Sequence, residues 1–238
     1  VVNKPKSAAY RAPGSTHVAF ATESVVDELA QKLGMDPLDL RLMNAAKEGT
    51  RRADGPRFAK IGCVEVMEAM KAHPHYNAPL NGANRGRGTA IGFWFNVGFA
   101  SSCNISVNTD GTVILTEGST DIGGSRASVA MQAAEVLGLE SEDMIPSVGD
   151  TDSVGWTGTT GGSRTAMSTG MAVVAAAEKI VEEMKRRAAI LWEVKPEDVA
   201  HEAGVYINTK SPEDRFKFKE LAAKIMQTGG PVTASGTS

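Results

Sequence analysis

A repeated tetrapeptide constrains the fold of this chain more than any other feature. The first glycine turn, Gly123-Gly124-Ser125-Arg126, recurs 38 positions later as the second glycine turn, Gly161-Gly162-Ser163-Arg164, and an apolar run rich in Ala and Met follows each copy. A glycine pair opens backbone conformations closed to other residues, and the first turn of a helix leaves N–H groups unpaired. Two such helix starts form an anion cradle if the fold brings them together. The alternative is a simple turn with a serine N-cap.

The second glycine turn lies in a stretch of small side chains. Between Thr157 and Thr165 the sequence has four threonines and four glycine or serine residues. Such a loop offers many small donors and no bulk, which suits a polar ligand pressed against the backbone. Neither nucleotide-binding fingerprint is satisfied, because no lysine follows the glycines and GxGxxG is absent.

Helix signals fill the first third of the chain. Apolar residues recur at helical spacing from Val25 to Leu33, and Gly34 supplies the stop. Asp36-Pro37 predicts the N-cap and first position of a second helix, and a third helix is predicted over Val64 to Ala72. The His-Pro-His sequence that ends it lacks the i, i+4 spacing of a helical metal site.

Strand signals follow. β-Branched and aromatic residues predict strands at Thr89 to Asn96, Asn104 to Asn108 and Thr112 to Thr116, and a later one near Met144 to Val148. Asp110-Gly111 predicts a hairpin turn. We expect the aromatic side chains of this region in the core rather than in a pocket wall; they are Phe93, Trp94, Phe95 and Phe99.

We expect the C-terminal part to have a structural role. It predicts a short helix at Pro196-Glu197-Asp198, a hairpin between residues 204–207 and 216–219, and a closing helix from Glu220 to Met226. The tail from Pro231 to Ser238 has no visible partner.

Charge and cysteine usage exclude several classes of function. The net charge of −3 provides no basic field, so nucleic acid is not an expected partner. Cys63 and Cys103 are widely spaced and match neither a disulfide framework nor a CxxC metal site. No run of 18 apolar residues exists, so we expect a cytoplasmic protein without a membrane partner.

A family resemblance rests on particular residues. Ala9-Tyr10-Arg11-Ala12-Pro13-Gly14, then Glu23, Asp27-Glu28-Leu29-Ala30, and Asp36-Pro37 through Leu40-Arg41 to Asn44 resemble the AxRGxG…E…DELA…DPxxLRxxN signature of the xanthine dehydrogenase and aldehyde oxidase family. The first glycine turn resembles that family's GxxDxGQG segment, and Thr160 to Thr165 resembles its second pterin-binding loop. The resemblance covers nearly the whole chain.

The resemblance implies an α+β fold of mixed helices and β-hairpins, part of the two-subdomain molybdenum-binding region of molybdenum hydroxylases. Residues 1–76 would be the helical part of the first subdomain, 77–87 a linker and 88–238 a second subdomain that is incomplete at its C-terminus. The implied cofactor is molybdopterin with Mo, of which the cytosine dinucleotide is one form. Iron–sulfur and FAD groups would lie on other domains or subunits, the assembly would be an oligomer, and the substrate would be an aldehyde, purine or other N-heteroaromatic molecule.

The resemblance also assigns site residues. The backbone N–H groups of Arg11 and Gly162 would lie near the Mo ligands, and Pro13 and Trp94 would face the substrate. The pterin or its phosphates would contact a set of small residues, namely Gly123, Gly124, Ser125, Thr160, Gly161, Gly162, Ser163 and Thr165. Helix N-termini favour anions by about 0.3–1 kcal/mol each, so this placement agrees with the anion cradle that the two helix starts alone indicate.

Two departures from the family pattern stand out. Gly124 occupies the place of a glutamine that hydrogen-bonds an oxygen ligand of the metal, and Gln132, about two helical turns further on, cannot simply replace it. In the family, a general-base glutamate lies in a GxGE motif that would fall further along than Ser238, and an FGGK-type segment would fall before Val1; this sequence contains neither. No catalytic residue is therefore expected in this chain, which alone should be inactive and should expose apolar surface and self-associate.

Three hypotheses remain from the sequence. The chain is a cofactor-binding segment of a molybdenum hydroxylase, or a non-catalytic module that binds a phosphate or nucleotide, or a structural piece whose glycine turns only begin helices. Molybdenum analysis of the full-length protein separates the first two, and the GxGE and FGGK segments would argue against the third.

Overall fold

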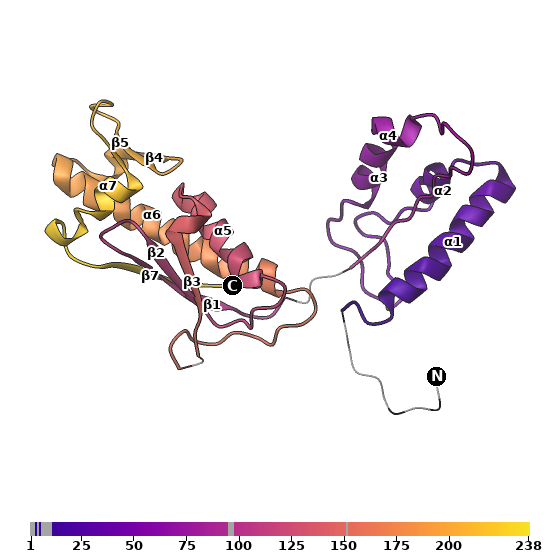
Figure 1. The fold of residues 1–238 in the computed structure, drawn as a ribbon, viewed down its shortest axis with the longest axis horizontal. Helices are drawn as coiled ribbons and strands as arrows, with labels where there is room; N and C mark the ends of the chain where they lie inside the picture. Colours follow the sequence, from indigo (N-terminus) through magenta and orange to yellow (C-terminus); the bar gives the residue numbers. More distant parts are fainter. Residues whose placement is uncertain (1–2, 4, 6–10, 95–97, 151) are drawn as a thin grey trace. The chain divides into compact units, whose positions relative to one another are not determined.

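The computed structural model describes residues 3, 5, 11–94, 98–150 and 152–238. It divides into two compact units, Val1–Trp94 and Phe95–Ser238, which are described separately (Figure 1). Ala9 and Tyr10 of the family signature, and Phe95 and Asn96 of the predicted strand, lie outside the described residues. Within these ranges, no helix has the length and apolar character needed to cross a bilayer.

Unit 1 is helical. Its helices are α1 (Ser15–Leu33), α2 (Pro37–Met43), α3 (Cys63–Ala72) and the single turn α4 (Pro74–Asn77). Helix α1 begins before the predicted apolar run and ends, as predicted, at Gly34, whose φ is 66°. The predicted Asp36 cap is confirmed, because its Oδ1 accepts from the amides of Leu38 at 2.8 Å and Asp39 at 3.1 Å.

A buried arginine joins these helices. Arg41 of α2 pairs through Nε with Glu23 Oε2 at 2.8 Å and through Nη1 with Asp27 Oδ1 at 2.7 Å, both on α1. Its Nη2 also donates to Thr89 O at 2.9 Å. The predicted strand over the described residues 89–94 is wrong, because the amide of Ile91 donates to Glu23 Oε2 instead of to a neighbouring strand.

Unit 2 is built on a four-stranded sheet in the order β3-β2-β1-β7. The strands are β1 (Ser102–Val107), β2 (Val113–Glu117), β3 (Met144–Val148) and β7 (Val232–Thr237). The predicted β1–β2 hairpin and the strand β3 are confirmed, and β3 runs parallel to β2. The expectation that the C-terminal tail has no partner is wrong, because β7 pairs antiparallel with β1 along its length.

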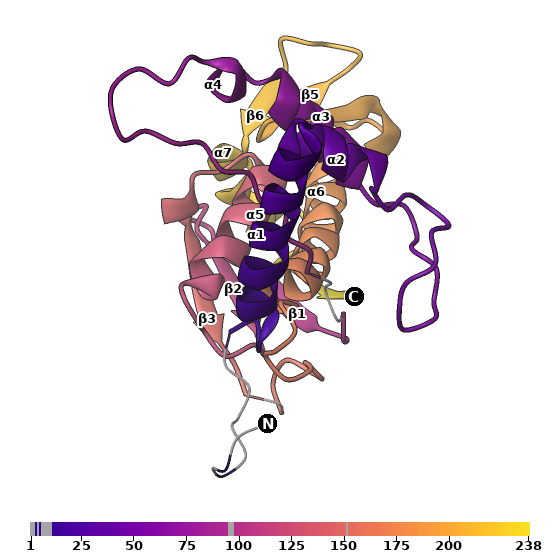
Figure 2. The same cartoon turned by 90° about the vertical axis from the view of Figure 1, so that its right-hand side faces the viewer.

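Two helices cover one face of this sheet, α5 (Ser125–Leu137) and α6 (Gly170–Trp192), as Figures 1 and 2 show. Their buried positions are mainly Ala and Val, whose small side chains allow a close approach to the strands. At Gly236 of β7 an added Cβ would lie 1.9 Å from Ala172 O of α6, so only glycine fits there.

The sequence expectation that the aromatic residues of this region lie in the core is wrong for Phe93, Trp94 and Phe99, while Phe95 lies outside the described residues. Phe93, Trp94 and Phe99 are 57 %, 40 % and 56 % exposed. Many other large apolar side chains are exposed as well, among them Val18, Phe20, Val25, Leu33, Met43 and Val66.

A smaller sheet packs at the other end of α6. It consists of β4 (Val199–Glu202), β5 (Val205–Asn208) and β6 (Arg215–Lys217), followed by α7 (Phe218–Ala222). The predicted hairpin is confirmed as β5–β6, whereas β4 was not foreseen. The closing helix starts earlier than predicted and stops at Ala222, before a 3₁₀ turn at Ile225–Gln227. The predicted helix at Pro196-Glu197-Asp198 is a single 3₁₀ turn.

Candidate functional site

The two glycine turns lie side by side in unit 2. An added Cβ on Gly118, which leads into the first turn, would sit 2.8 Å from Thr157 Oγ1, which leads into the second. Gln132 of α5 donates from Nε2 to Ala166 O at 3.1 Å, directly after the second turn. The fold therefore brings the two helix starts together, which a cradle made by both turns requires.

The first turn presents bare backbone at the start of α5. Gly123 and Gly124 have φ values of 62° and 80°, which glycine adopts without strain, and an added Cβ on either would meet nothing within 4 Å. The serine-cap alternative is wrong here, because Gly124 and not Ser125 is the N-cap of α5. Asp121 orders the turn instead, accepting from the amide of Arg126 at 3.1 Å and pairing with its guanidinium at 3.5 Å.

The second turn uses the same four residues in a register shifted by one. Its left-handed pair is Gly162 and Ser163, with φ values of 61° and 60°. The helix then begins at Thr165 as a π-helical turn, Thr165–Thr169, that continues into α6. Its N-cap is Arg164, whose side chain makes no capping hydrogen bond. Single π-helical turns inside α-helices occur frequently at functional sites.

This shift gives the two arginines opposite roles. Arg126 falls within the first helical turn and its side chain is 47 % exposed. Arg164 precedes its helix and is fully buried. Arg164 donates from Nε to Gly98 O at 3.1 Å, from Nη1 to Gly158 O at 2.8 Å, and from Nη2 to Ala100 O at 3.3 Å. Burial lowers the pKa of Arg164, an effect that the nearby Glu117 opposes.

Two buried hydroxyls of the second turn lack partners. In the part of the chain that the structure describes, Thr160 Oγ1 and Thr165 Oγ1 make no hydrogen bond. A buried hydroxyl without a partner costs about 1–3 kcal/mol, so two in one turn indicate a missing acceptor or donor. Next to them, an added Cβ on Gly161 would meet nothing within 4 Å. The second turn thus fits a polar ligand that contacts backbone and hydroxyl groups.

The structure also assigns a special environment to Glu117, which the sequence placed on an ordinary strand face. Glu117 ends β2 and is only 1 % exposed. Burial raises its pKa, and hydrogen bonds from the amide and hydroxyl of Ser119 partly oppose this. No sequence signal marked this carboxylate, because alternation along β2 leaves open which face the helices cover.

Three predicted site residues belong to unit 1. Arg11 and Pro13 lie exposed in the loop before α1, and Trp94 ends the unit. Among described residues, no group of three or more His, Cys, Asp and Glu side chains could hold a metal ion. The His-Pro-His sequence forms a local turn, in which His73 Nδ1 accepts from the amide of His75 at 3.1 Å.

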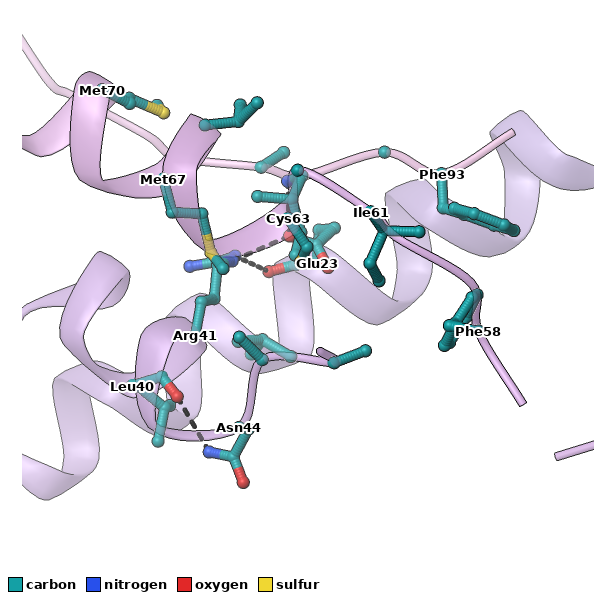
Figure 3. A pocket seen from close by; sticks show the side chains of 18 of the residues that line it. Glu23, Leu40, Arg41, Asn44, Phe58, Ile61, Cys63, Met67, Met70 and Phe93 are labelled. Carbon is teal, nitrogen blue, oxygen red and sulfur yellow. Dashed lines mark hydrogen bonds and ion pairs between the residues drawn. The ribbon is translucent and has the colours of Figure 1, made fainter. Parts of the chain in front are cut away.

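Unit 1 also contains an apolar cavity of about 880 Å³ (Figure 3). Its walls come from α1, α2, α3 and residues 90–93. The ring of Phe93 meets that of Phe58 edge to face at 5.6 Å on this wall, while Arg41 and Glu23 contribute the polar side. Phe93 therefore lines a pocket, contrary to the sequence expectation, whereas Trp94 is not among the lining residues.

Comparisons with known proteins agree with the geometry of the turns. The family described as molybdopterin cofactor-binding domain matches residues 62–238, and a second family of the same description matches residues 1–45. The putative xanthine dehydrogenase molybdenum-binding subunit XdhA of Escherichia coli K12 is 28 % identical over 254 aligned residues, covering 99 % of this chain and 34 % of that protein. The aldehyde oxidoreductase molybdenum-binding subunit PaoC of Escherichia coli O157:H7 is 33 % identical over 61 % of this chain and 21 % of PaoC.

Among solved structures, quinoline 2-oxidoreductase from Pseudomonas putida 86 shares the fold. The TM-score is 0.74 at 21 % sequence identity, over 96 % of this chain and 33 % of that one. The chain thus spans about a third of the length of XdhA and of this structure. The alternative of a non-catalytic phosphate- or nucleotide-binding module finds no support among these relatives.

Proposed function

The chain belongs to the molybdopterin cofactor-binding domain family, and from this premise we propose that its two glycine turns hold a molybdopterin in a molybdenum hydroxylase of the xanthine dehydrogenase and aldehyde oxidase type. One observation carries the proposal most directly. Thr160 and Thr165 carry unpaired buried hydroxyls in a turn where an added Cβ on Gly161 would meet nothing within 4 Å. A pterin with its phosphate provides the ring nitrogens and anionic oxygens that such groups bind.

The proposed contacts come from both turns. Gly123, Gly124 and Ser125 would cover the cofactor from the first turn, and Thr160, Gly161, Gly162, Ser163 and Thr165 would bind it from the second. The amide of Gly162 would lie near the Mo ligands. From unit 1, the amide of Arg11 would approach the same ligands, and Pro13 and Trp94 would form part of the substrate wall.

The metal chemistry belongs to the cofactor. When bound, molybdopterin supplies the redox centre for hydroxylating an electron-poor carbon of an aldehyde or N-heteroaromatic substrate with oxygen from water. The described residues contribute binding and orientation. Iron–sulfur and flavin domains or subunits would take up the electrons, and the cytosine dinucleotide form of the cofactor, an oligomeric assembly and a cytoplasmic location stay predictions.

Gly124 distinguishes this chain from the family pattern. Glycine offers no side chain to the oxygen ligand that a glutamine contacts in the family, and Gln132 is committed to Ala166 O. The amide of Gln132 also packs against Gly170, where an added Cβ would come within 2.0 Å of Oε1. We therefore propose that the first turn binds the cofactor through its backbone alone.

Substitution at Gly161 tests the proposal. Its φ lies outside the left-handed region and its Cβ position is open, so Gly161→Val should fold normally while its methyl groups enter the proposed cofactor space. A steric cost above about 1.4 kcal/mol lowers affinity at least about tenfold. The assay is molybdenum and pterin content of the full-length protein purified from its native host. Gly86→Val, at another open glycine, is the matched control.

The outcomes separate clearly. The proposal expects molybdenum and pterin near one equivalent in the wild type, a large loss in Gly161→Val, and no change in the control. Less than about a tenth of an equivalent of molybdenum in the wild type, with phosphate or nucleotide bound instead, would contradict the molybdenum assignment. Full cofactor in Gly161→Val would show that the second turn is not the site.

A further inference from the structure

A chain of buried polar side chains runs between the two glycine turns. Its members, each at most 1 % exposed, are Glu117, Ser119, Thr169, Ser101 and Arg164. Ser119 Oγ lies 2.7 Å from Thr169 Oγ1, which lies 3.0 Å from Ser101 Oγ. Arg164 donates from Nη2 to Ser101 Oγ, and Glu117 accepts from the amide of Ser119.

The members come from segments that are far apart in sequence. Glu117 and Ser119 lie at the end of β2 and lead into the first turn. Arg164 is part of the second turn, and Thr169 ends the π-helical turn that follows it. Ser101 directly precedes β1. The central hydroxyl of Thr169 therefore connects the segment of the first turn with that of the second.

The guanidinium end is compatible with one direction of the hydrogen bonds. A guanidinium only donates, so Arg164 fills an acceptor position of Ser101 Oγ. The hydroxyl of Ser101 can then donate to Thr169, and that of Thr169 to Ser119. The series continues to Glu117 through the backbone amide of Ser119. Aligned hydrogen bonds of this kind strengthen one another inside a protein.

We propose that this series is a positioning device that sets the spacing of the two cofactor-binding turns, with Thr169 as its central positioning residue. The inference rests on the proposed function, because the spacing matters only if one ligand contacts both turns. The hydroxyl of Thr169 bonds to the two serines rather than to the glycines of either turn. It acts by holding Ser119, which leads into the first turn, against Ser101, to which Arg164 of the second turn donates.

Thr169→Val tests the device. Valine keeps the shape of threonine and removes the hydroxyl on which both serines depend. In full-length protein with its native partner subunits, we expect the release of pterin, followed by fluorescence after transfer to cofactor-free buffer, to be about tenfold faster than in the wild type. Thr169→Ser keeps the hydroxyl and should restore release to within about twofold of the wild type.

Thr228→Val is the matched control. Thr228 is also buried and its hydroxyl also makes two contacts, to Ile225 O at 3.1 Å and Lys224 O at 3.4 Å, near the other end of α6. Its loss should lower the melting temperature without changing the release of pterin. Equal acceleration in Thr228→Val, no acceleration in Thr169→Val, or no rescue by Thr169→Ser would overturn the positioning role.

Hydrogen exchange keeps this test separate from that of the proposed function. In Thr169→Val, amides of residues 118–126 and 157–166 should exchange faster together, whether or not the protein binds a pterin. Faster exchange confined to one of the two segments would overturn the inference. A wild type without pterin but with coupled exchange would instead overturn the proposed function and retain the device.

Discussion

Replacing the two arginines of the repeated tetrapeptide by methionine should have very different effects on stability. Arg164→Met removes four hydrogen bonds from a fully buried guanidinium. Gly98 O keeps a bond from Ser168 Oγ and Ala100 O keeps one from the amide of Gly158. Gly158 O, by contrast, loses the donor that Arg164 provided.

The magnitude follows from these contacts. A buried carbonyl without a donor costs about 1–3 kcal/mol, and each bond to a charged donor contributes about 1.5–3 kcal/mol. Relief of the desolvation of Arg164 offsets part of the loss. We expect the free energy of unfolding of unit 2 to fall by about 2–4 kcal/mol, or its melting temperature by roughly 4–16 °C at 2–4 °C per kcal/mol.

Arg126→Met is the control supplied by the sequence itself. The pair of Arg126 with Asp121 is long at 3.5 Å and exposed, so its loss should cost about 0–1 kcal/mol and depend on salt. Urea unfolding of both variants, with hydrogen exchange of residues 157–168, measures the difference. Comparable losses in the two variants, or a loss below about 1 kcal/mol for Arg164→Met, would refute the reasoning.

Three further predictions concern other parts of the fold. Asp36→Ala should cost unit 1 about 0.5–2 kcal/mol, measured by urea unfolding. Burial raises the pKa of Asp36, but its hydrogen bonds outweigh this and the pKa is lowered, so its stabilisation holds above the ordinary Asp range and is lost as pH falls through the folded pKa. Gly111→Ala should cost about 1–3 kcal/mol in thermal unfolding, because φ is 86° and the added Cβ would lie 2.5 Å from Lys219 Cγ. Burial raises the pKa of Cys103 to about 11, so iodoacetamide at pH 8 should label Cys63 and spare Cys103 by mass spectrometry.

Each of these three predictions has a result that would contradict it. A pH-independent difference between wild type and Asp36→Ala from pH 7 to pH 3 would exclude the capping carboxylate as its cause. Gly230→Ala, where φ is 89° but nothing lies within 4 Å, isolates the backbone strain, and equal losses at both glycines would remove the clash from the explanation. Labelling of Cys103 before Cys63 in the folded protein would mean that its strand opens readily.

Local chemistry made much of the fold predictable. The Asp36 cap, the Gly34 stop and the Asp110-Gly111 turn act through neighbours a few residues away, and the structure has all three where the sequence placed them. Two predictions that depended on distant partners were wrong, the strand at residues 89–94 and the tail without a partner. Residues 89–94 have strand-like composition, yet carboxylates of α1 take their amides.

The candidate site was likewise predictable only in its local features. The repeat identified both turns, but the burial of Arg164 and the exposure of Arg126 depend on where each helix begins. The first helix begins at the third residue of its tetrapeptide and the second only after the fourth, a difference that identical tetrapeptides cannot encode. Glu117, Ser119, Ser101 and Thr169 carry no motif, because a buried hydroxyl series exists only after three segments have packed together. The family resemblance predicted the cofactor, whereas the polar series between the two turns became visible only in the folded structure.

The pairing of β7 with β1 also has a consequence for how unit 2 folds. Ser102 pairs with Thr237, so the sheet joins the first and last strands of the unit across more than a hundred residues. Such distant contacts raise the entropy that must be lost before the sheet gains stability, and they slow folding. During synthesis, β1 has to wait for Val232–Thr237 to emerge from the ribosome, and until then it presents an open edge on which chaperones and other nascent chains can act.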